Sequence, residues 1–152
     1  RRSTTGLVIM QQNAAVVWIS KRQPFVTIST CEAEYIALST LGNEVGYFNQ
    51  LSDALHMHER PLQVYADNTC AIQLVSDSVH HARTKHIDVR YHHIRDLVAL
   101  NEMKVDYVDT KLNLADGFTK GLPRDSHTKF ACGVLGVDTL RTGFLSRNDD
   151  TP

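Results

Sequence analysis

The chain has 152 residues, of which 42% are hydrophobic and 22% are charged, and its formal net charge at pH 7 is -1. This length suits one domain with its own core, and the composition is that of an ordinary globular protein. The small net charge excludes a protein held on nucleic acid by its overall field, so any nucleic-acid surface has to be local. No apolar run approaches the roughly 20 residues that cross a bilayer, so we expect no membrane partner.

The cysteines give no sign of a cross-linked framework. Cys31, Cys70 and Cys132 lie far apart and show no CxxC spacing. This pattern argues against disulfides and against a thiolate zinc site, and it favours a reducing compartment. The histidines at 56, 58, 80 and 81 have no cysteine or acidic partner at zinc spacing, which argues against zinc there as well.

The first part of the chain favours β-structure. Residues 6–10 and 14–20 predict the two strands of a hairpin, with a turn over 11–13. After a break over 21–24, residues 25–28 are again β-favouring. We therefore expect three consecutive antiparallel strands.

A change of period marks a long helix. Ser29 and Glu32 fit a capping box, with Ser29 as N-cap and Glu32 at the third helical position. Apolar residues then recur at steps of three and four, at Leu38, Leu41, Val45, Phe48, Leu51 and Leu55. Gly42 and Gly46 each cost the helix roughly 1 kcal/mol relative to Ala, so we expect them to mark close packing.

Strands and helices alternate in the rest of the chain. Strands are predicted over 62–66 and 103–108, and helices over 69–75, 85–100, 114–120 and 126–135. This order predicts an α/β fold, a mixed β-sheet flanked by helices. We expect one domain over residues 1–136 and a flexible polar tail over 137–152.

Three acids occupy similar places in this scheme. Glu34 lies in the first turns of the long helix, Asp67 follows a buried strand, and Asp116 opens the helical turn after the last strand. Acids at such positions can converge on one edge of a sheet, where a hard divalent ion such as Mg²⁺ would relieve their repulsion. The alternatives are structural: Glu34 as a solvated residue, Asp67 as the N-cap of the next helix, and Asp116 as an acid favoured by the helix dipole.

Several motifs in order resemble one family, the ribonuclease H domain of Ty1/copia-type retrotransposon polyproteins. They include KRQP at 21–24, EAEY at 32–35, ADN at 66–68, ARTKHIDVRYH at 82–92 and LADGFTK at 114–120. Each motif alone is weak, but the series is specific, and the resemblance spans about residues 1–136.

The resemblance implies a ribonuclease H-like fold, with a five-stranded mixed sheet flanked by helices. It implies Mg²⁺-dependent endonucleolytic hydrolysis of the RNA strand of RNA–DNA hybrids during reverse transcription. Two ions are implied, with Mn²⁺ as a substitute, held by four carboxylates. Glu34, Asp67 and Asp116 match three of the four, with Glu32 as a rival of Glu34 that the capping box explains better. The first acid, on the first strand, has no match in this chain, and we expect that strand to be missing.

The densest basic segment is the candidate surface for nucleic acid. Arg83, Lys85, His86 and Arg90 are expected to contact phosphates of the hybrid, the alternative being a solvated helix face. The resemblance also implies a reverse transcriptase domain upstream in the same polyprotein. The location it implies is the cytoplasmic virus-like particle, with the nucleus as the second possibility.

Two further hypotheses stay open beside the nuclease. One is a catalytically inactive ribonuclease H-like module that binds nucleic acid. The other is an integrase-like strand-transfer enzyme on the same fold, which the motif series disfavours.

Overall fold

The computed structural model describes residues 2–24, 26–57, 60–76 and 85–137, except for the side chains of 85–91. The chain divides into two compact units. Unit 1 comprises residues 1–5 and 22–113, and unit 2 comprises residues 6–21 and 114–152. The predicted loop over 76–83 and the predicted tail lie almost wholly outside the described residues.

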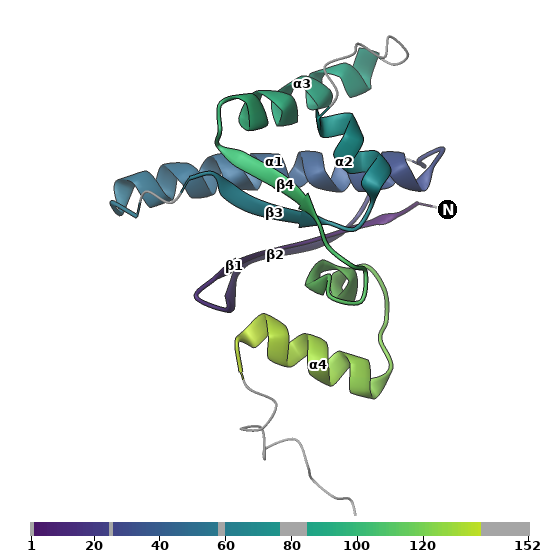
Figure 1. The fold of residues 1–152 in the computed structure, drawn as a ribbon. Helices are drawn as coiled ribbons and strands as arrows, with labels where there is room; N and C mark the ends of the chain where they lie inside the picture. The colour runs from purple at the N-terminus through teal and green to yellow at the C-terminus, as the bar shows by residue number, and fades with distance from the viewer. Residues whose placement is uncertain (1, 25, 58–59, 77–84, 138–152) are drawn as a thin grey trace, which may run out of the picture. The chain divides into compact units, whose positions relative to one another are not determined.

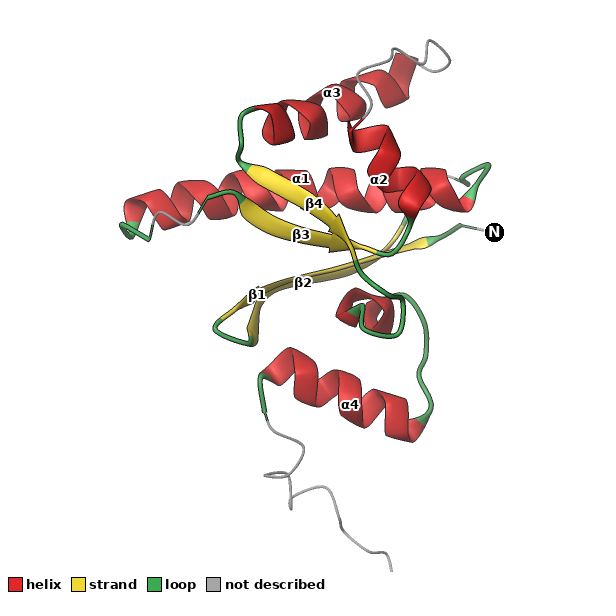
Figure 2. Ribbon diagram, viewed as in Figure 1, coloured by secondary structure: helices red, strands yellow, loops and turns green. Residues whose placement is uncertain are grey.

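The elements confirm the α/β class (Figure 2). In chain order they are β1 (Thr4–Gln11), β2 (Ala14–Arg22), α1 (Thr30–Ala54), β3 (Leu62–Ala66), α2 (Thr69–Ser76), α3 (Lys85–Ala99), β4 (Met103–Tyr107), η1 (Leu114–Phe118) and α4 (Arg124–Leu135). The described strands form two separate two-stranded sheets, β1–β2 and β3–β4, in place of the single mixed sheet that we expected.

The predicted third strand over 25–28 is wrong for the residues that can be judged. Val26, Thr27 and Ile28 are not in a strand, and Ile28 is 96% exposed; Phe25 lies outside the described residues. Side-chain bonds fix the connection instead. Buried Gln23 donates through Nε2 to Thr5 Oγ1 at 3.1 Å and to the Ala33 carbonyl at 3.0 Å. Local β-propensity is overridden because these bonds already hold the chain between β2 and α1.

Unit 1 is built around a parallel strand pair. Strands β3 and β4 pair from Leu62 with Met103 to Ala66 with Tyr107, and helices α1, α2 and α3 gather beside them (Figure 1). Parallel strands need a crossover connection, and α2 and α3 supply it. The core of this unit is apolar and deeply buried, at Tyr35, Leu38, Val45, Val64, Ala71, Val75, Ile94, Leu97 and Met103.

Helix α1 crosses α3 closely at Gly42. A Cβ at this position would lie 3.2 Å from Leu97 Cδ1 and 3.6 Å from Ile94 Cγ1, so a larger residue would push the helices apart. The prediction of close packing is thus confirmed at Gly42. It is wrong at Gly46, where no atom of the described neighbours lies within 4 Å of an added Cβ. The predicted apolar stripe is buried only in its first half, since Leu51 and Leu55 are 43% and 58% exposed.

A polar network ties the far end of α1 to the start of β4. Buried Asn49 donates to Glu102 Oε2 at 2.6 Å, and Arg60 Nη1 donates to Glu102 Oε1 at 2.6 Å. Arg60 also pairs with Asp53 of α1. Because one carboxylate serves two donors from different segments, the network fixes where β3 enters the sheet.

Unit 2 combines the hairpin with η1 and α4. The hairpin turns at Gln12 and Asn13, whose φ angles of 49° and 65° suit the tight turn of a two-residue loop. Ser20 Oγ donates to the Phe118 carbonyl at 2.7 Å. The Phe118 and Phe130 rings meet edge to face with centroids 4.9 Å apart, so α4 packs on η1.

Candidate functional site

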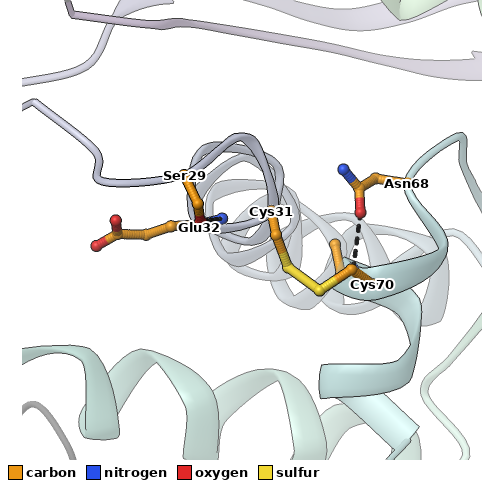
Figure 3. The surroundings of a disulfide bond; sticks show 6 residues. Ser29, Cys31, Glu32, Asn68 and Cys70 are labelled. Atoms are coloured by element: carbon orange, nitrogen blue, oxygen red, sulfur yellow. Dashed lines mark hydrogen bonds between the residues drawn. A yellow bond between two sulfur atoms is a disulfide. The ribbon is translucent and has the colours of Figure 1, made fainter.

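The start of α1 separates the roles of two neighbouring glutamates. Ser29 Oγ accepts from the Glu32 amide at 3.1 Å (Figure 3). Glu32 Oε2 accepts from the Ile28 amide at 2.7 Å. The predicted capping box is therefore confirmed, with the Glu32 carboxylate reaching one residue further back than usual. Glu32 has a structural role, whereas Glu34, two residues later, is an exposed residue of the same helix.

Asp67 follows the last residue of β3 and is partly buried. The alternative that it caps α2 is wrong, because the next residue does so. Asn68 Oδ1 accepts from the Ala71 amide at 3.0 Å, and the Asn68 carbonyl accepts from the Ile72 amide at 3.1 Å. Within the described parts of the chain, no hydrogen bond or ion pair engages the Asp67 carboxylate. A partly buried carboxylate without a capping role is a suitable ligand for a cation.

A disulfide joins the segments that carry these two acids. Cys31 and Cys70 are bonded, with their Cα atoms 5.9 Å apart (Figure 3). The prediction against disulfides is therefore wrong for this pair. The two cysteines are 39 residues apart in the sequence but adjacent in space, because β3 returns the chain to the start of α1. Glu34 lies three residues after one cysteine, and Asp67 three residues before the other.

Asp116 belongs to unit 2, where η1 positions it. Its Oδ2 accepts from Lys120 Nζ at 2.6 Å, and its Oδ1 accepts from Thr119 Oγ1 at 3.4 Å. A cation is thus already beside this carboxylate. The i,i+4 spacing of this acid and lysine is visible in the sequence and is the signal that could have indicated the pair.

The predicted contacts to nucleic acid fall at the edge of what the structure describes. Arg83 lies outside the described residues. Lys85, His86 and Arg90 lie on α3, but their side chains are not described. These four residues remain a prediction.

The predicted metal ligands have suitable chemistry. Carboxylate oxygens are the donors that Mg²⁺ prefers, and Glu34, Asp67 and Asp116 supply them. Within the residues that the structure describes, no group of three or more His, Cys, Asp and Glu side chains is arranged so that it could hold a metal ion. Glu34 and Asp67 belong to unit 1, and Asp116 to unit 2.

None of the described helices is both long enough and apolar enough to span a membrane.

No family model matches the chain, and no solved structure matches it.

Curated relatives are found among the proteins of plant transposons. The retrovirus-related Pol polyprotein from transposon TNT 1-94 of Nicotiana tabacum is 43% identical over 125 residues, which is 82% of this chain and 9% of that polyprotein. The corresponding polyprotein from transposon RE1 of Arabidopsis thaliana is 35% identical over 133 residues, 87% of this chain and 9% of its own length. The one from transposon RE2 of the same plant is 34% identical over 146 residues, 94% of this chain and 10% of its own length.

The chain thus spans about a tenth of the curated relatives that it matches. Its homologues are retrovirus-related Pol polyproteins of plant transposons, and they support its place as a segment of a retrotransposon polyprotein.

Proposed function

We propose that this chain is the ribonuclease H segment of a retrotransposon Pol polyprotein, which hydrolyses the RNA strand of RNA–DNA hybrids with Mg²⁺. The observation that carries the proposal is the identity of the capping residues at the starts of α1 and α2. Glu32 and Asn68 perform the capping, so neither Glu34 nor Asp67, the acids of the EAEY and ADN motifs, is the capping residue at its helix start. The Pol polyprotein relatives support the retrotransposon polyprotein context of this proposal.

Glu34, Asp67 and Asp116 are the proposed metal-binding acids. Mg²⁺ ions held by these acids would supply charge stabilisation for the attacking water and the leaving oxygen of phosphodiester hydrolysis. The chain's own contribution is the carboxylate oxygens of these three acids, which are the donors that Mg²⁺ prefers. In the structure, Lys120 donates a hydrogen bond to Asp116 and so balances the charge of that carboxylate.

The acid that the family carries on its first strand has no match in this chain. We therefore propose that the active form includes an upstream segment of the polyprotein. Arg83, Lys85, His86 and Arg90 are the proposed contacts to the hybrid, and a reverse transcriptase domain is the proposed neighbour. Because an A-form-like hybrid is recognised through its backbone and 2′-OH groups, cleavage is expected to depend little on sequence. The proposed place of work is the cytoplasmic virus-like particle.

A second candidate is the inactive module that binds nucleic acid. Two other observations favour it. Only three of the four family acids are matched in this chain. The described residues also contain no group of three His, Cys, Asp or Glu side chains that could hold a metal ion.

The neighbouring glutamates provide a matched test of the proposal. In the form extended upstream through one further strand, Glu34→Gln should lower Mg²⁺-dependent cleavage of a labelled RNA–DNA hybrid by about 100-fold or more, since even outer-shell changes cost 10–100-fold. Glu32→Gln should keep cleavage and lower the free energy of unfolding by about 1 kcal/mol or less, because only a capping bond is weakened.

Both variants remove one negative charge from the same helical turn, so a general electrostatic effect would act on them equally. Equal loss of cleavage in the two variants, or loss in Glu32→Gln alone, contradicts the assignment of Glu34.

A further inference from the structure

Cys31 and Cys70 occupy equivalent places in two helices. Cys31 is the second residue of α1, and Cys70 is the second residue of α2 (Figure 3). Both therefore lie in the first turn of a helix. Their Cα separation of 5.9 Å lies within the range that a disulfide allows. Cys31 is partly exposed and Cys70 is exposed, whereas the third cysteine, Cys132, is buried and free. Only the paired cysteines are therefore open to reagents in solution.

The surroundings of the pair favour exchange chemistry. The partial positive charge at a helix N-terminus stabilises a nearby thiolate, and the thiolate is the form that attacks a disulfide. Exposed disulfides are the ones that small thiols reach and reopen, while buried ones serve as permanent staples. Both features apply to this pair, because both cysteines lie at helix starts and both are at least partly exposed.

The fold does not depend on this bond to place α2. Ala71 is fully buried and Val75 is 4% exposed, and both belong to the core of unit 1. Asn68 caps the helix through its own side chain. Helix α2 therefore has its own anchors in either oxidation state, and opening the bond releases only the link between the two helix starts.

We propose that Cys31 and Cys70 are a site of reversible thiol oxidation, exchanging with a small-molecule couple of the glutathione type. In the forward direction, the Cys70 thiolate attacks glutathione disulfide and releases one glutathione. The Cys31 thiolate then attacks the Cys70 sulfur of the mixed disulfide and releases the second. Two protein thiols are oxidised, one glutathione disulfide is reduced, and the two protons end on the two glutathione thiols.

The bond restrains the segments that carry Glu34 and Asp67, and this consequence rests on the proposed function. Each acid lies three residues from one of the bonded cysteines. Oxidation thus adds a covalent link between the starts of α1 and α2, and reduction removes this link. Since catalysis gains from groups held in place beforehand, the oxidised form is the more active nuclease.

The test is a redox titration of the whole 152-residue chain in buffers of stepped glutathione to glutathione disulfide ratio, with acid quenching, alkylation and peptide mass spectrometry. We expect Cys31 and Cys70 to change together in one two-electron step, about 30 mV per tenfold change in the equilibrium. Cys132 should be alkylated only after denaturation. Hydrogen exchange across the starts of α1 and α2 should rise on reduction, and Cys31→Ser should show the reduced pattern at every ratio.

Cys132→Ser is the control, and it should titrate like the unaltered chain. The proposal is overturned if the pair stays reduced at the most oxidising ratio, or if it resists glutathione at the most reducing one. Cleavage of a hybrid by the extended form is measured at both extremes as a separate arm. A pair that titrates in a chain without cleavage at either extreme leaves the redox site standing and removes the nuclease.

Discussion

Replacing Asp67 by Asn in the extended form should lower Mg²⁺-dependent cleavage of an RNA–DNA hybrid by about 100-fold or more, with binding of the hybrid nearly unchanged. The amide keeps the size of the side chain but loses the charge that a metal ligand needs. Folding should be unaffected, because Asn68 and not Asp67 caps α2. Cleavage rates and hybrid affinity are measured on the same preparation, and thermal unfolding checks that the fold persists.

Asp106→Asn is the matched control for this experiment. Asp106 lies on β4, opposite Tyr65 of β3, and is paired with Lys104 at 2.8 Å. The hydrogen bond from Lys104 lowers the pKa of the Asp106 carboxyl, so Asp106→Asn removes a negative charge while the proposed metal-binding acids stay in place. The control should keep full cleavage. Full cleavage by Asp67→Asn, or equal loss in both variants, contradicts the role given to Asp67.

Replacing Ile94 by Ala should lower the free energy of unfolding by about 2–5 kcal/mol. Ile94 is fully buried at the crossing of α3 with α1, where Gly42 lets the helices approach. Truncation removes buried methyl groups and leaves a cavity that the close crossing prevents from collapsing. The loss is a large share of the 5–15 kcal/mol typical of a domain, and urea unfolding followed by circular dichroism measures it.

Leu100→Ala provides the comparison for this stability measurement. Leu100 directly follows α3 and is 71% exposed, so its truncation should change the free energy of unfolding by about 0.5 kcal/mol or less. Losses of similar size at the two positions would show that the core of unit 1 is not where the structure has it.

Local sequence patterns predicted those elements whose stabilising contacts lie within one helical turn or one strand. Ser29 and Glu32 are a capping box in the sequence and in the structure, because both partners lie within one helical turn. Strands β3 and β4 lie within one residue of their predicted bounds, because a buried face imposes alternation along each strand. The start of α2 was likewise predicted, although its cap is Asn68 and not its neighbour.

What local signals could not provide are the consequences of tertiary contacts. Residues 26–28 favour a strand by composition, yet Gln23 holds the connection through bonds to Thr5 and Ala33 that no periodicity announces. The Cys31–Cys70 bond depends on the return of β3 to the start of α1, so it follows from topology and not from spacing. A usable signal was nevertheless present, since each cysteine stands two residues after a good capping residue, Ser29 or Asn68.

The candidate site divides in the same way. Glu34 and Asp67 were predicted from motifs, and the structure adds what motifs could not, namely that Glu32 and Asn68 perform the capping. Asp116 and Lys120 pair although η1 ends at Phe118, so the i,i+4 spacing indicated the pair but not the local conformation that forms it.

Cleavage of a hybrid labelled on its RNA strand tests the central claim most directly, with Mg²⁺ present, in this chain and in the form extended upstream through one further strand. A hybrid labelled on its DNA strand serves as the parallel substrate. The account predicts that the extended form cuts the RNA strand only, that a chelator stops the cut, and that the 152-residue chain alone is far slower. An intact RNA strand in both forms, with the hybrid still bound, would contradict the nuclease and identify a module that only binds nucleic acid.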